Sequence, residues 1–159
     1  NTFSDSYNAT INSQQMVGRG ENFYTYGGFN RKISLSWTVA ALSREELIPM
    51  HKKLSYLASN TAPEYSANGY MKGPLVQLTV GGYLKDMPGY IESISLDYIT
   101  EMPWEIAITP EGTKDDTISQ LSHMVKVNSF SFIPIPNYLP ERGANFIELI
   151  KGNGTGNLW

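Results

Sequence analysis

The stretch VGGYLKDMPGYIESISLDY, residues 80–98, decides the predicted fold, because it contains two strand-like runs joined by a turn. The turn is expected at KDMPG, residues 85–89, where proline and glycine favour reversal of the chain. In the second run, Ile94, Leu96 and Tyr98 alternate with small polar residues, which is the pattern of a half-buried strand. No residue in the stretch has the character of a catalyst. The sequence therefore predicts an antiparallel hairpin without chemistry of its own.

The same two-residue alternation marks the other strands of the predicted sheet. In RKISLSWTV, Ile33 and Trp37 share the apolar face, so the Trp37 side chain is expected in the core. In VKVNSFSFIPI the alternation changes phase at Asn128 and Ser129, which predicts a β-bulge. The predicted strands are residues 31–39, 75–84, 90–99 and 125–135.

Residues 43–60 change to a helical period, with one apolar face made of Leu47, Met50, Leu54, Leu57 and Ala58. Ser43 and Glu46 have the spacing of a capping box, and Leu42 with Leu47 fits a hydrophobic staple. Pro49 is expected to kink the helix or restart it. An amphipathic helix of this kind predicts packing against the sheet.

Three segments of the chain differ in composition. Residues 1–30 are rich in Asn, Ser, Thr, Gly and Tyr, which predicts an extended, largely irregular N-terminal arm, with disorder as the alternative. Residues 31–138 hold the β domain, including a long connection at 100–124 of the kind that is often functional. Residues 139–159 form a C-terminal tail. The chain begins with Asn1 rather than Met, as a trimmed or partial chain would.

Composition excludes several classes of function. The 159 residues fit a single domain, and the absence of cysteine excludes disulfides, zinc thiolate sites and thiol nucleophiles. The net charge of −3 and the scattered basic residues argue against a general nucleic-acid binder. No apolar run approaches the roughly 18 residues of a membrane span. No cofactor is implied.

Few residues are candidates for catalysis or binding. His51 and His123 are expected to be solvated, and no cluster has metal-ligand spacing. A glycosidase pair would have to come from the acids of the long connection, which are Glu101, Glu105, Glu111, Asp115 and Asp116. Trp104 and Trp159 could stack on sugars or be buried at protein interfaces.

Four strands and one helix leave sheet edges uncovered in a single chain, and a ring of identical subunits that pair edge to edge would cover them. The small polar faces of the strands would then suit the lumen of a pore, although an ordinary solvent-facing surface explains them equally well. The candidate channel-lining residues are Ser34, Ser36, Thr38, Gln77, Thr79, Ser93, Ser95, Asp97, Lys126 and Asn128.

Several motifs resemble baseplate and tail-tube junction proteins of contractile-tailed phages. They are SDSYNATINSQQMVGRGENFYTYGGFNRKISLSWTVAA (4–41), YMKGPLVQLTVGGYLKDMPGYIESISLDY (70–98), WEI (104–106) and LSHMVKVNSFSFIPI (121–135). The resemblance covers residues 4–138 in order. Ser122 stands where the family commonly has proline, and the region GENFYTYGGFN matches more loosely.

The resemblance implies a mainly β, tail-tube-like fold, an antiparallel β-sandwich or barrel with one flanking helix around 43–60. It implies a non-enzymatic virion protein, assembled in the host cytoplasm into a homo-oligomeric ring, commonly a hexamer, that joins the baseplate hub to the tail tube. DNA would pass through the channel without specific binding. A tail tube subunit is the nearest alternative. Expected contacts with other subunits are Met16, Phe23, Tyr24, Tyr26, Trp104, Ile106, Phe146 and Trp159.

Overall fold

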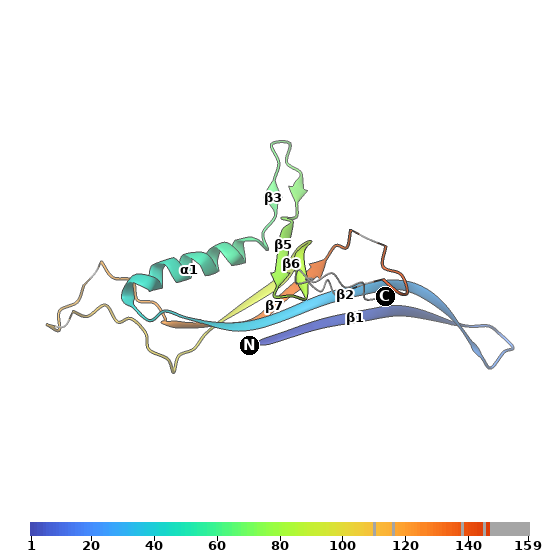
Figure 1. Cartoon of the computed structure of the whole chain (residues 1–159), viewed down its shortest axis with the longest axis horizontal. Coiled ribbons are helices and arrows are strands. Elements are labelled where there is room, and N and C mark those ends of the chain that lie inside the picture. The colour runs from blue at the N-terminus through green and yellow to red at the C-terminus, as the bar shows by residue number, and fades with distance from the viewer. Residues whose placement is uncertain (110, 116, 138, 145, 147–159) are drawn as a thin grey trace, which may run out of the picture.

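The protein, shown in Figure 1 as a computed structural model, is elongated and built around one large sheet. The structure describes residues 1–109, 111–115, 117–137, 139–144 and 146. Its elements are β1 (Thr2–Gln15), β2 (Asn22–Ala40), α1 (Arg44–Ser59), β3 (Glu64–Tyr65), β4 (Met71–Lys72), β5 (Val76–Val80), β6 (Leu84–Tyr98) and β7 (Met124–Pro134). No helix in these ranges is long and apolar enough to span a membrane.

The large sheet has the strand order β1-β2-β7-β6-β5, and every neighbouring pair is antiparallel. The predicted mainly β fold with one helix is therefore confirmed. The expected sandwich or barrel is wrong, because the sheet is open and β1 and β5 form its two edges. The sheet curls without closing: the ring of Tyr83, beside the β5–β6 turn, lies 5.9 Å from the ring of Phe3 in β1.

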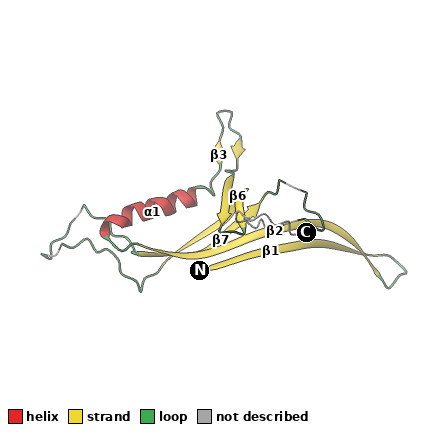
Figure 2. Cartoon of the chain, viewed as in Figure 1, coloured by secondary structure: helices red, strands yellow, loops and turns green. Residues whose placement is uncertain are grey.

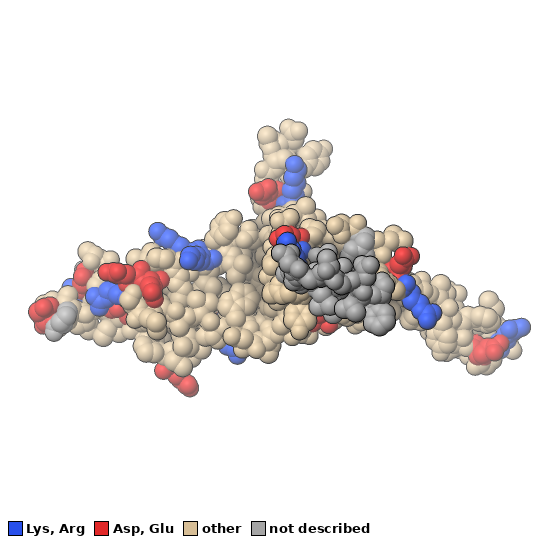
Figure 3. Space-filling model, viewed as in Figure 1, with Lys and Arg blue, Asp and Glu red and all other residues tan. Residues whose placement is uncertain are grey.

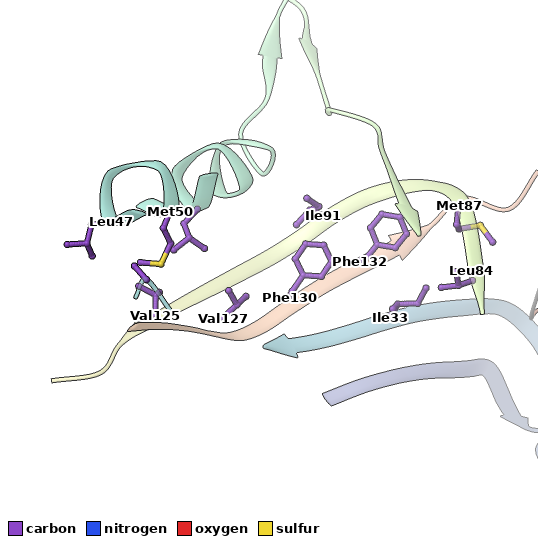
Figure 4. Packing of buried hydrophobic residues seen from close by; sticks show 12 residues of the cluster. Ile33, Leu47, Met50, Leu84, Met87, Ile91, Val125, Val127, Phe130 and Phe132 are labelled. Atoms are coloured by element: carbon purple, nitrogen blue, oxygen red, sulfur yellow. The ribbon is translucent and has the colours of Figure 1, made fainter. Parts of the chain in front are cut away.

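The core lies on one face of the sheet, under α1 at one end and inside the curl at the other (Figure 4). The predicted helix face is confirmed, since Leu47, Met50 and Leu54 are buried while Leu57 and Ala58 are half-buried. Trp37 joins the core as predicted, with its ring 5.6 Å from that of Phe130. The other fully buried aliphatic and aromatic side chains, from the strands, are Ile33, Leu84, Val125, Val127 and Phe132.

The ends of α1 differ from the predicted motifs. The Glu46 carboxylate accepts a hydrogen bond from the Leu42 N–H at 3.0 Å, but the Ser43 side chain makes no cap bond. The predicted staple is wrong, because the Leu42 side chain is 93% exposed. The helix also continues through Pro49 without a restart. Burial of the apolar face therefore outweighs the missing hydrogen bond at the proline.

The turn of the opening hairpin lies at residues 81–83, so the turn predicted at 85–89 is wrong. Residues 85–89 belong to β6 and bend it. Asp86 has a φ of 50° and its N–H bonds the Thr79 hydroxyl oxygen at 3.0 Å, where β6 carries an extra residue opposite β5. The proline and glycine of the stretch thus mark a bend in a continuous strand, whereas two other glycines, Gly81 and Gly82, reverse the chain.

Two further bulges distort the centre of the sheet. The predicted bulge at Asn128 and Ser129 is confirmed, since β7 has an extra residue there against both β2 and β6. A second extra residue, Glu92, lies in β6 between Ile91 and Ser93. Because a bulge increases the local twist of a strand, these irregularities favour the curl of the sheet.

The N-terminal segment is more regular than expected. Residues 1–30 are extended as predicted, but they form β1 and the first part of β2 in place of an irregular arm. Figure 2 shows this long ribbon tapering away from the rest of the sheet. From Asn22 to Lys32, β2 is paired with β1 alone, because its pairing with β7 begins at Ile33.

Candidate functional site

The candidate site is the sheet face opposite the core, which carries mainly small polar side chains. Directly paired residues share a face, so the register places Ser4, Ser34, Ser131 and Ser93 in one row across β1, β2, β7 and β6. The row formed by Thr38, Lys126 and Asp97 crosses the same face. The result is a largely polar surface that extends over several strands.

The ten predicted channel-lining residues all fall on this face or at its bulge. Ser36 and Asp97 are half-buried, and the other eight are exposed. The prediction missed Ser4, Ser129 and Ser131. Thr2, Ser4 and Ser6 alternate with Phe3 and Tyr7, so two-residue periodicity in β1 was the available sign of that strand.

Each positive charge considered on the polar face lies beside a negative one. Lys32 forms an ion pair with Glu92, and the Ser131 hydroxyl donates to the same carboxylate at 2.8 Å. Hydrogen bonding from Lys32, and then from Ser131, lowers the pKa of Glu92. Lys126 lies directly opposite Asp97 in the register. The face therefore combines small side chains with locally balanced charge.

The edges and ends of the molecule carry the exposed apolar side chains. Of the predicted contact residues, Met16, Phe23, Tyr24, Tyr26, Trp104 and Ile106 are exposed. Phe146 is half-buried within its own chain, where its ring lies 5.4 Å from both Tyr7 and Phe29. Trp159 lies outside the described residues. Figure 3 shows charged side chains at both ends of the molecule, over α1 and on the projection that holds β3 and β4, with fewer on the rest of the body in this view.

Glu105 is the most constrained acid of the long connection. Its carboxylate accepts two hydrogen bonds from Arg44 at 2.9 and 3.0 Å and one from the Ala107 N–H at 3.0 Å. The Arg44 bonds are the main cause of a lowered pKa for Glu105. A general acid in a glycosidase needs a raised pKa, so this environment suits a structural anchor that ties the connection to α1.

The histidines also have structural partners. His51 Nε2 lies 3.0 Å from the Ser122 carbonyl oxygen, and its ring stacks on Tyr98. His123 Nδ1 lies 3.2 Å from the Ala41 carbonyl oxygen. Each histidine is half-buried rather than solvated. Within the described ranges, no group of three or more His, Asp or Glu side chains is arranged to hold a metal ion.

A cavity of about 420 Å³ lies beside β2, where β7 ends. Its apolar lining comes from Phe29, Ile133, Pro134, Pro136, Pro140 and Phe146, and its polar lining from Asn8, Asn30, Arg31, Lys32 and Glu92. The Arg31 guanidinium, whose side chain is 6% exposed, donates twice to Asp5, at 3.0 and 2.6 Å. The two positive side chains of the cavity wall therefore each pair with a carboxylate, Arg31 with Asp5 and Lys32 with Glu92.

No protein-family model matches this chain, and no curated protein matches it either.

Proposed function

We propose that the chain is a structural subunit of a contractile-tailed phage baseplate, forming a ring that joins the hub to the tail tube and templates tube assembly. The observation that carries the proposal is an open sheet whose two edges are unpaired within the described residues and whose one face is polar and charge-balanced. The resemblance of the motifs in residues 4–138 to phage baseplate proteins is the reason for choosing this particular assembly.

An open sheet supports a ring because its edges need partners. In the described part of the chain, no strand pairs with the outer edge of β1, which runs for 14 residues. Free backbone groups over that length favour pairing with another chain. Identical subunits that pair through two different edges assemble head to tail, and the assembly closes when the rotation between subunits divides a full turn. The polar face would then surround a channel.

The polar face also suits the passage of DNA. Affinity for DNA grows with each phosphate that a Lys or Arg neutralises. On this face Lys32 is paired with Glu92 and Lys126 lies opposite Asp97, so few free positive charges would face the channel. A finished ring would present the geometry that lowers the cost of nucleating the next ring of the tube.

Negative-stain imaging of the purified full chain, alone and with its hub and tube partners, tests the proposal. The expected result is a ring with a central hole. Tubes are expected to grow from these rings only when the hub is present. Long filaments formed by the chain alone would identify the tail tube subunit instead. A strictly monomeric particle at high concentration, with no ring in the virion, would refute the proposal.

Trp104 provides the test of a different class of function. Its ring is 41% exposed, although its Nε1–H already donates to the Ile99 carbonyl oxygen at 3.3 Å. Binding to a glycan array that disappears in Trp104→Ala would favour a carbohydrate-binding module over a ring subunit. Release of peptidoglycan fragments that stops in Glu105→Gln would likewise favour an enzyme.

A further inference from the structure

Residues 61–75 form a finger that projects from the body between α1 and β5 (Figure 1). β3 and β4 pair in it through only two residues each. The tip is a defined turn, in which the Ser66 N–H donates to the Tyr70 carbonyl at 3.0 Å and Gly69 adopts a φ of +79°. At the base, Gly73 lies against the ring of Tyr90.

The finger exposes a large apolar surface for so small an element. Tyr65, Tyr70, Met71 and Leu75 are 72%, 74%, 70% and 63% exposed. At about 150–250 Å² for a large side chain, these exposed fractions leave roughly 400–700 Å² uncovered. That is at least about half of one partner's share of a standard protein interface. A two-stranded hairpin is also marginal on its own in water, so a partner surface would stabilise it.

The cavity beside β2 has the properties of a receiving site for these side chains. At about 420 Å³ it falls in the range of pockets that enclose a bound group. Its wall is largely apolar, while Asn8 and Asn30 supply amides that can bond a tyrosine hydroxyl. Because Arg31 pairs with Asp5 and Lys32 with Glu92, the wall favours an uncharged occupant over an acidic one.

We propose that the finger of one copy of this chain docks in the cavity of a neighbouring copy, with Tyr70 as its anchor. A projecting apolar group and a complementary cavity at different places on one molecule make a head-to-tail contact, which generates rings or filaments. The inference rests on the proposed ring and names one contact that holds its subunits together.

Cysteine cross-linking tests the contact directly, because the chain contains no native cysteine. Under mild oxidation, a mixture of Tyr70→Cys and Asn30→Cys chains is expected to form disulfide-linked dimers that neither variant forms alone. The double variant is expected to form a ladder of covalent species up to the size of the ring. As a matched control, Leu42→Cys, which is exposed at the start of α1, should not cross-link with Asn30→Cys.

The outcomes separate this contact from the ring itself. Rings without any cross-link between the finger and the cavity would refute the docking and leave the ring proposal standing. If the double cysteine variant forms covalent dimers and nothing larger, the docking is supported but the ring is refuted. Self-linked Tyr70→Cys chains would show fingers meeting each other and would overturn the inference.

A second measurement uses sedimentation of the full chain. The double variant Tyr65→Ser and Tyr70→Ser removes two exposed anchors outside the core, so the circular dichroism of the monomer should not change. Self-association is expected to weaken at least about tenfold, as when an interface anchor is truncated. Leu42→Ser should leave it unchanged. Equal association of the double variant and the unaltered chain would refute the role of the finger.

Discussion

Gly89 is the residue at which the curled sheet should be most sensitive to a single added methyl group. A Cβ built at this position would fall inside contact distance of the Ile133 carbonyl oxygen and 2.5 Å from Phe132 Cζ. Ordinary contacts between carbon atoms lie near 3.5–4.0 Å, so β6 and β7 would have to separate locally by about 1 Å. The Ile133 carbonyl oxygen belongs to the main chain, so it cannot rotate away as the end of a side chain could.

The expected cost of Gly89→Ala combines three effects. Overpacking costs about 1–3 kcal/mol, and one or two weakened ladder hydrogen bonds add about 1–2 kcal/mol. The unfolded chain has lower conformational entropy with alanine than with glycine, which reduces the destabilisation by about 0.5 kcal/mol. The free energy of unfolding should therefore fall by about 2–4 kcal/mol, which lowers Tm by about 5–15 °C for a chain of this size.

Urea denaturation followed by circular dichroism measures this change, with the midpoint expected to fall while the m-value stays constant. Gly82→Ala is the matched control, because a Cβ there meets nothing within 4 Å. Its free energy of unfolding should stay within about 0.5 kcal/mol of the unaltered chain. A Gly89→Ala chain as stable as the Gly82→Ala control would refute the close approach of β6 to β7.

Three other changes test the remaining packing and charge arguments. Leu47→Ala should lower the free energy of unfolding by about 2–5 kcal/mol in the same urea assay, because it leaves a cavity under α1, whereas Leu42→Ala should change it by less than about 0.5 kcal/mol. Asp5→Asn removes the carboxylate that accepts two hydrogen bonds from the buried Arg31 guanidinium and should cost about 1.5–3 kcal/mol by thermal unfolding; an unchanged Tm would contradict the buried ion pair. The pKa of Glu105 is lowered from 4.5 in the folded chain, so its ionised carboxylate stabilises the fold. This contribution to the free energy of unfolding is complete above pH 4.5 and is lost as the pH falls through the lowered pKa. Unfolding measured from pH 7 to pH 3 should therefore show the deficit of Glu105→Gln shrinking with acidification, and a deficit that does not vary with pH would count against the lowered pKa.

Elements with strong apolar periodicity could be predicted from the sequence. The strand around Ile33 and Trp37, the buried face of α1 and the bulge at Asn128 all follow from side-chain spacing, because burial on one face imposes that spacing. The small polar face followed from the same alternation. Its ion pair between Lys32 and Glu92 did not, since the extra residue in β6 decides where the Glu92 side chain lies.

Elements that depend on distant contacts were missed or misplaced. β1 has no buried side chain and is stabilised by its pairing with β2, so its weak alternation of Thr2, Ser4 and Ser6 with Phe3 and Tyr7 was not recognised as a strand. Pro88 and Gly89 were predicted in a turn, yet they lie in a strand that must pass close to Phe132. The finger was predicted as a loop, although Asn68-Gly69 between Tyr65 and Tyr70 is a recognised hairpin signal.

The bulges at Glu92 and Asn128 have an evolutionary consequence. Each is a single extra residue between two stretches whose apolar side chains face the core, so removing it would restore regular alternation: Val127 would be followed by Ser129 and then Phe130, on the same faces as before. A one-residue deletion at either site would therefore change the twist of the strand while keeping its apolar and polar sides. Related chains could vary the curvature of the subunit through gaps inside strands, where insertions and deletions are normally selected against.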